Sequence, residues 1–121
     1  MVIRIEETSE IPIYVQIRNQ IVMGISSGEL SPGEQLPTVR ALAEEMGVNT
    51  MTVSKAYQQL KVEGYIVTER KRGARVREQL ERSGTLSDTN LAELKRIVSE
   101  ARICGINKQA FLEIVEAFFE E

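Results

Sequence analysis

Residues 37–64 have the sequence PTVRALAEEMGVNTMTVSKAYQQLKVEG. Apolar residues recur in it twice at the i, i+3, i+4, i+7 spacing of a buried helical stripe. The first set is Val39, Leu42, Ala43 and Met46, and the second is Val53, Ala56, Tyr57 and Leu60. Thr38 and Asn49 can cap the two helices, while Gly47 and Gly64 can end them. Two short amphipathic helices joined by about three residues are typical of a helix-turn-helix.

A further helix is predicted upstream, because Ile13, Ile17, Ile21 and Ile25 recur every four residues. Pro12 suits its start and Gly28 its end. Residues 31–34, Ser-Pro-Gly-Glu, then indicate a tight turn.

A β-hairpin is predicted directly after the helix-turn-helix. Residues 65–69, Tyr-Ile-Val-Thr-Glu, are aromatic and β-branched and favour a strand. Residues 70–73 supply a polar turn with a glycine, and residues 74–77 can return as a second strand. This order is the outline of a winged helix.

The last part of the chain has the pattern of two more helices. Ser87 or Asp88 can cap the first, which Gly105 ends, and Asn107 can cap the second. We therefore expect a mainly α protein with a small β-hairpin wing, in which residues 1–78 form a winged helix-turn-helix domain and residues 79–121 form a two-helix tail.

Composition excludes several classes of function. The chain of 121 residues has no histidine and one cysteine, so it lacks the usual general base, a disulfide and a cysteine pair for a metal. We expect no enzymatic activity, no cofactor and no metal. Its apolar runs are too short to span a membrane and it does not open on a secretion signal, which predicts a cytoplasmic protein.

Charge is distributed unevenly along the chain. The net charge is −3, but residues 35–77 hold eight Lys and Arg against four Asp and Glu. Residues 78–121 reverse this balance, with five against nine. A basic segment inside an acidic chain indicates a nucleic-acid partner for that segment alone.

The candidate DNA-binding residues lie outside the apolar stripes. Short polar residues near the start of the third helix suit base edges and phosphates, Met51 suits a thymine methyl, and Arg40 suits a guanine or a phosphate. The wing tip is dense in cations, which favours a phosphate backbone or a minor groove. The full set is Arg40, Asn49, Thr50, Met51, Thr52, Ser54, Lys55, Arg70, Lys71, Arg72, Gly73 and Arg75. An ordinary solvated helix face, a soluble hairpin tip and an Arg40–Glu44 surface pair are the alternatives.

The sequence of the tail predicts a homodimer. The tail has many apolar side chains, and it is too short to bury them in a core of its own. The expected interface comprises Leu91, Leu94, Ile97, Val98, Phe111, Ile114, Val115, Phe118 and Phe119. Folding of the tail back onto its own domain is the alternative. Cys104, near the end of an apolar face, is expected to be a buried packing residue rather than a redox sensor.

The segment from Ile11 to Arg77 resembles the GntR family of regulators. The matching residues are Gly33-Glu34-Gln35-Leu36-Pro37-Thr38-Val39-Arg40, Leu42-Ala43, Met46-Gly47-Val48-Asn49, Thr52-Val53, Ala56-Tyr57, Leu60 and Glu63-Gly64-Tyr65. The resemblance implies that Arg40, residues 49–52 and Ser54 face DNA, and that Gly73 lies at a wing tip that enters the minor groove. Many members carry Arg or Pro-Asn where this chain has Thr50-Met51, so the family's consensus operator is not expected here.

The short tail resembles the YtrA-like branch of that family, which implies a dimer that often controls transporter operons. The function expected is therefore a repressor that binds double-stranded DNA at a palindromic operator as a homodimer. The sequence leaves open whether a small-molecule effector binds in the dimer groove. The alternatives are a winged helix that binds proteins and a nonspecific nucleic-acid binder.

Overall fold

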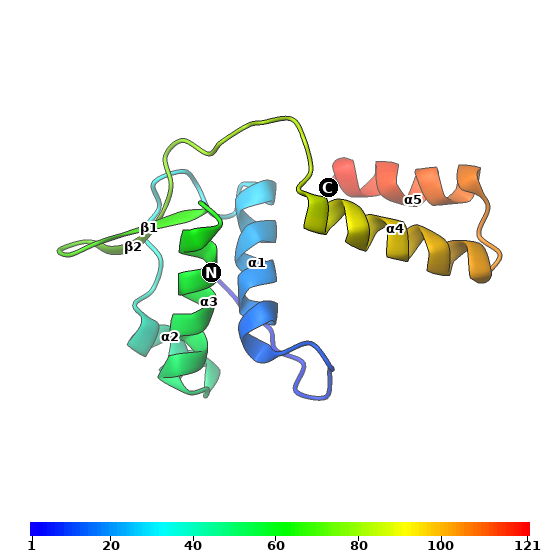
Figure 1. Ribbon diagram of the computed structural model, residues 1–121. Helices are drawn as coiled ribbons and strands as arrows, with labels where there is room; N and C mark the ends of the chain where they lie inside the picture. Colours follow the sequence, from blue (N-terminus) through cyan, green and yellow to red (C-terminus); the bar gives the residue numbers. More distant parts are fainter. The chain divides into compact units, whose positions relative to one another are not determined.

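Three helices form the core of the first part of the chain: α1 (Ile13–Ser27), α2 (Val39–Met46) and α3 (Thr50–Val62). The computed structural model, which describes residues 1–121, shows α3 packed against both α1 and α2 (Figure 1). The buried side chains at this junction are Ile17, Ile21, Leu42, Ala43, Val53, Ala56, Tyr57 and Leu60. The apolar stripes that the sequence predicts are therefore the surfaces that meet in the core.

The wing is an antiparallel hairpin of β1 (Ile66–Glu69) and β2 (Gly73–Val76). Glu69 pairs with Gly73 across a loop of three residues, Arg70 to Arg72. Gly73, the residue directly after this loop, has a φ of 69°, a left-handed conformation that glycine adopts without steric strain. Ile66, Ala74 and Val76 are buried against the helices, which anchors the base of the hairpin.

The segment that follows α1 lines the free edge of the wing. The amide of Leu36 donates to the carbonyl of Ala74 at 2.8 Å, and the amide of Val76 donates to the carbonyl of Glu34 at 2.9 Å. The predicted turn at residues 31–34 is thus tied to β2, and the wing is held from two sides. The predicted fold class, mainly α with a hairpin wing in a winged helix-turn-helix, is confirmed.

Two more helices, α4 (Asp88–Ile103) and α5 (Lys108–Phe119), follow the wing. The chain divides into two compact units, Met1–Glu81 and Arg82–Glu121. Ser87 caps α4 and Asn107 caps α5 through their side-chain oxygens, as the sequence predicts. Within the second unit only Ala101 is buried, so these helices have almost no core of their own. The prediction that residues 1–78 bind DNA and residues 79–121 form a dimerisation tail stays a prediction.

The expectation that Cys104 is buried is wrong, because its side chain is exposed. Helix α4 ends at Ile103 and Cys104 is the residue that caps its C-terminus. The chain then reverses at Gly105, which has a φ of 84°. Cys104 therefore lies at the outer end of the helix, beyond the stripe in which Ala101 is buried.

Candidate nucleic-acid interface

The start of α3 is fixed by a side-chain cap. The Oδ1 atom of Asn49 accepts a hydrogen bond from the amide of Met51 at 2.7 Å, and Thr38 caps α2 in the same way through the amide of Ala41. These caps satisfy amides that the first helical turn cannot pair internally. The two caps thereby fix where α2 and α3 begin.

The outer face of α3 carries the predicted recognition residues. Thr50, Met51, Ser54 and Lys55 are exposed, and Thr52 is half-buried. The side chain of Met51 is 77% exposed. The same helix buries Val53, Ala56, Tyr57 and Leu60 on its opposite face. One face of α3 thus builds the core, while the other presents hydroxyl, amide, thioether and ammonium groups to the surroundings.

Arg40 lies in the first turn of α2 and is exposed. The structure does not contain the alternative surface salt bridge between Arg40 and Glu44, because Arg40 is in none of the ion pairs of the structure. The guanidinium group keeps all its donors available for a partner.

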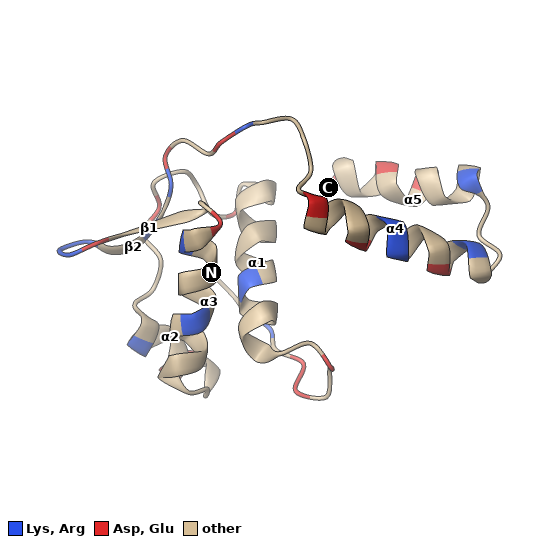
Figure 2. Cartoon of the chain, in the orientation of Figure 1, with Lys and Arg blue, Asp and Glu red and all other residues tan.

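The wing tip carries unpaired positive charge. Arg70 and Lys71 are exposed and form none of the ion pairs of the structure, whereas Arg72 lies 3.8 Å from the Glu69 carboxylate. Figure 2 shows this basic tip at the far end of the hairpin, with further basic residues on α2 and α3. The side chain of Gln35 donates to the carbonyl of Arg72 at 2.9 Å, which ties the loop to the segment before α2.

Arg75 occupies a different environment from its neighbours in the wing. Its Nε and Nη2 atoms donate to the carbonyl of Gly33 at 3.1 and 3.0 Å, and its side chain is only 19% exposed. The carboxylates of Glu69 and Glu78 each lie 3.8 Å from it. The predicted DNA-binding role of Arg75 remains a prediction, but its donors already hold the wing to the turn at Gly33.

Sequence reasoning missed two residues that the structure brings to this surface. The ring of Tyr14, from α1, lies beneath the Lys55 ammonium at 4.1 Å from ring centroid to nitrogen. Gln35 reaches the wing loop across 37 positions of sequence. The only signal for Tyr14 was its place beside the apolar stripe of α1, and no local pattern links Gln35 to the loop.

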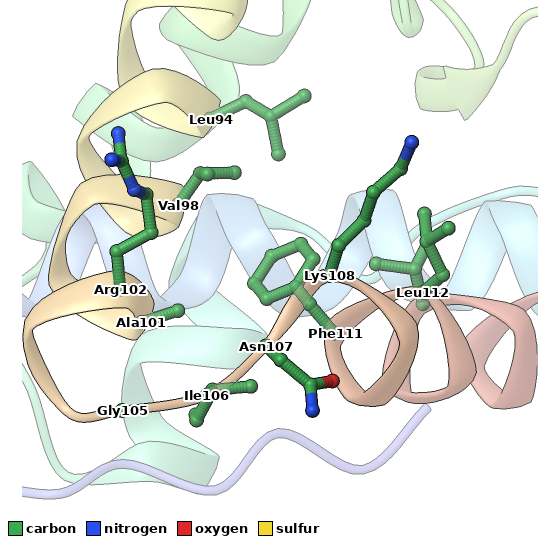
Figure 3. A pocket seen from close by; sticks show the side chains of 11 residues that line it. Leu94, Val98, Ala101, Arg102, Gly105, Ile106, Asn107, Lys108, Phe111 and Leu112 are labelled. Atoms are coloured by element: carbon green, nitrogen blue, oxygen red, sulfur yellow. The ribbon is translucent and has the colours of Figure 1, made fainter.

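The second unit presents an apolar groove between α4 and α5 (Figure 3). It has a volume of about 710 Å³ and is lined by Leu94, Val98, Ala101, Arg102, Gly105, Ile106, Asn107, Lys108, Phe111, Leu112 and Val115. Of the nine residues predicted for a dimer interface, Phe111 and Val115 are half-buried and the other seven are exposed: Leu91, Leu94, Ile97, Val98, Ile114, Phe118 and Phe119.

The structure contains no cluster of three or more His, Cys, Asp or Glu side chains arranged to hold a metal ion. None of its helices is both long enough and apolar enough to cross a membrane.

Comparison with known proteins identifies the family of the winged helix. The family model described as "Bacterial regulatory proteins, gntR family" matches residues 13–76. The chain is 35% identical over 118 residues to the HTH-type transcriptional repressor YtrA of Bacillus subtilis, a match that covers 94% of this chain and 89% of that protein.

Solved structures are similar to the chain as well. A transcriptional antiterminator from Listeria monocytogenes is similar to the chain with a TM-score of 0.84 and 30% sequence identity. The match covers 98% of this chain and 90% of the antiterminator chain. The DNA-binding domain of AraR, solved in complex with operator ORX1, is similar with a TM-score of 0.54 and 28% sequence identity. The match covers 60% of this chain and 90% of the AraR chain. Together with the winged helix and its exposed recognition helix, these matches show that the chain is a DNA-binding transcriptional regulator and belongs to the GntR family.

Proposed function

We propose that this chain is a repressor that binds a two-fold symmetric operator as a homodimer. Its α3 helices would read two major grooves, its wings would hold phosphates or the minor groove, and its α4 and α5 helices would join the two copies. The similarity to the repressor YtrA of Bacillus subtilis supports the direction of regulation. Control of a transporter operon and an effector in the dimer groove stay predictions.

The DNA-binding part of the proposal rests on unpaired donors. Arg40, Arg70 and Lys71 are exposed and carry charge that no carboxylate of the chain pairs with. Each cation that neutralises a phosphate releases condensed counterions, which gives affinity, while contacts from α3 and Arg40 to base edges would give sequence preference. Arg75 stays a predicted contact, although its Nε and Nη2 atoms already donate to the Gly33 carbonyl.

The observation that carries the homodimer is the uncovered apolar surface of the tail. Only Ala101 is buried among residues 82–121, whereas Phe118 is 65% and Phe119 86% exposed. Burying one such side chain contributes about 1.5–3 kcal/mol, which favours a partner for this surface. A second copy supplies the same apolar faces, and a two-fold dimer matches the symmetry of a palindromic operator.

The DNA-binding part is tested by selection from a random duplex library at 150 mM salt. We expect wild type to enrich an inverted repeat and Arg40→Ala to lose preference at one base pair of each half-site, costing about 1–3 kcal/mol. Lys95→Ala is the matched control, because it removes one cation from α4 and should leave the selected sequence unchanged. Binding without sequence enrichment would identify a charge-driven binder, and absence of binding would point to a protein-interaction module.

The homodimer is tested by sedimentation at micromolar concentrations. We expect wild type to have twice the mass of one chain, and Val98→Glu to be a monomer because a carboxylate would be buried in the groove. Lys95→Glu, on the same helix but absent from the groove lining, should remain dimeric. A wild-type chain that stays monomeric over this range contradicts the homodimer and leaves the DNA-binding role intact.

A further inference from the structure

A second groove lies on the first unit, between the start of α1 and the first turns of α3. It has a volume of about 590 Å³ and is lined by Tyr14, Met51, Thr52, Ser54, Lys55 and Gln58. Five of these six residues belong to α3, and Tyr14 alone comes from α1. The Nζ atom of Lys55 lies 4.1 Å from the centroid of the Tyr14 ring, well within the range of a cation–π contact.

We propose that Tyr14 is a positioning residue for DNA binding, whose ring holds the Lys55 ammonium in this groove in the conformation that meets a backbone phosphate. The inference rests on the DNA-binding role proposed for α3 and adds a residue from outside the helix-turn-helix to it.

The nature of the contact keeps the charge of Lys55 available. A carboxylate partner neutralises a cation, as Glu63 does for Arg18 at 2.7 Å. An aromatic ring attracts an ammonium through its quadrupole and carries no net charge. Lys55 forms none of the ion pairs of the structure. It is therefore held in place while its full positive charge and its free N–H donors remain available to a phosphate.

Holding the side chain in advance removes part of the cost of binding. A free lysine samples many rotamers and loses that freedom when it meets a phosphate. The ring of Tyr14 restricts these rotamers before DNA arrives. Because Tyr14 also packs against the core, its own position is fixed by the winged helix. The polar groups of Thr52, Ser54 and Gln58 line the same groove and suit the sugar–phosphate backbone.

A double-mutant cycle on the full-length chain tests the inference, with Kd for the selected operator measured from 100 to 300 mM salt. Lys55→Gln removes one phosphate contact from each copy of the proposed dimer, so the slope of log Kd against log salt should fall by about 1.8, which is about 0.9 for each contact. Tyr14→Leu should weaken operator binding by about two- to five-fold for each copy of the dimer, which is about 4- to 25-fold in all, and should leave the Kd of Lys55→Gln unchanged. Tyr14→Phe keeps the ring and should bind as wild type does.

Two further readouts separate positioning from a structural role. The ε-methylene protons of Lys55 should resonate upfield through the ring current in wild type and Tyr14→Phe, and should return to ordinary values in Tyr14→Leu. Thermal unfolding of each variant shows whether the fold is retained. A Tyr14→Leu penalty of equal size in both backgrounds would overturn the inference, since the ring would then act without Lys55. If Arg40→Ala and Lys55→Gln both bind as wild type does, the DNA-binding role of this surface fails and the inference fails with it.

Discussion

The hydroxyl of Tyr57 donates a hydrogen bond to the carbonyl oxygen of Pro37 at 2.7 Å. Tyr57 lies on the buried face of α3, and Pro37 directly precedes Thr38, the residue that caps α2. The bond thus ties the recognition helix to the start of the helix that carries Arg40. Two proposed DNA contacts, from α3 and from α2, depend on this link for their relative position.

Tyr57→Phe should lower the free energy of unfolding by about 1–3 kcal/mol, because the Pro37 carbonyl loses its donor in a part-buried position. Urea unfolding followed by circular dichroism measures this change. Tyr65→Phe is the matched control, since the Tyr65 hydroxyl takes part in none of the hydrogen bonds from side chains. Equal losses in the two variants would show that the Tyr57 hydroxyl has no particular role.

Alkaline pH should destabilise the chain through Tyr57, because burial raises the pKa of its hydroxyl above the ordinary value of 10.0. Above about pH 10 the unfolded chain releases a proton that the folded chain keeps, so the contribution of Tyr57 to stability is present below that pH and is lost as pH rises. Above that pH, the free energy of unfolding should fall by about 1.4 kcal/mol per pH unit because of Tyr57. Unfolding of wild type and Tyr57→Phe between pH 9 and 11 measures it, and parallel curves would contradict the prediction.

Arg75→Ala and Lys71→Ala should separate stability from DNA affinity within one hairpin. Arg75→Ala removes two hydrogen bonds to the Gly33 carbonyl and should lower the free energy of unfolding by about 1–3 kcal/mol. Lys71→Ala should leave stability unchanged and reduce the salt slope of operator binding by about 1.8, which is about 0.9 for each copy of the proposed dimer. Thermal unfolding and fluorescence anisotropy measure the two effects. The reverse pattern would show that Arg75 contributes to DNA affinity and Lys71 to stability.

The pair of Arg18 and Glu63 should couple α1 to the end of α3. Two hydrogen bonds join them, at 2.7 and 2.9 Å, and the bond to Glu63 raises the pKa of the Arg18 guanidinium. A double-mutant cycle with Arg18→Ala and Glu63→Ala should give a coupling energy of about 0.5–1 kcal/mol, since both side chains are partly exposed. Additive effects on the free energy of unfolding would show that solvent screens the pair.

The local elements of this protein could be predicted from its sequence because their signals lie within a few residues of one another. The caps Thr38 and Asn49 directly precede the helices that they start, and Gly73, which has a positive φ, directly follows the hairpin loop. The i, i+3, i+4, i+7 spacing of the apolar positions separated the buried face of α3 from the face that carries Lys55. The fold class and the exposed face of α3 that we propose for DNA binding follow from these short-range rules.

Contacts between residues that lie far apart in the sequence could be found only in the tertiary structure. Composition marked Arg75 as one more cation of the wing, but the segment that runs along β2 brings the Gly33 carbonyl to its guanidinium across 42 positions. Tyr14 gave no sign of a role until packing of α1 on α3 placed its ring under Lys55. Cys104 looked buried by its spacing and is exposed, because the end of a helix has no neighbour to cover it. Periodicity fixes the faces of a helix, whereas the contacts of a side chain depend on which distant segments the fold brings beside it.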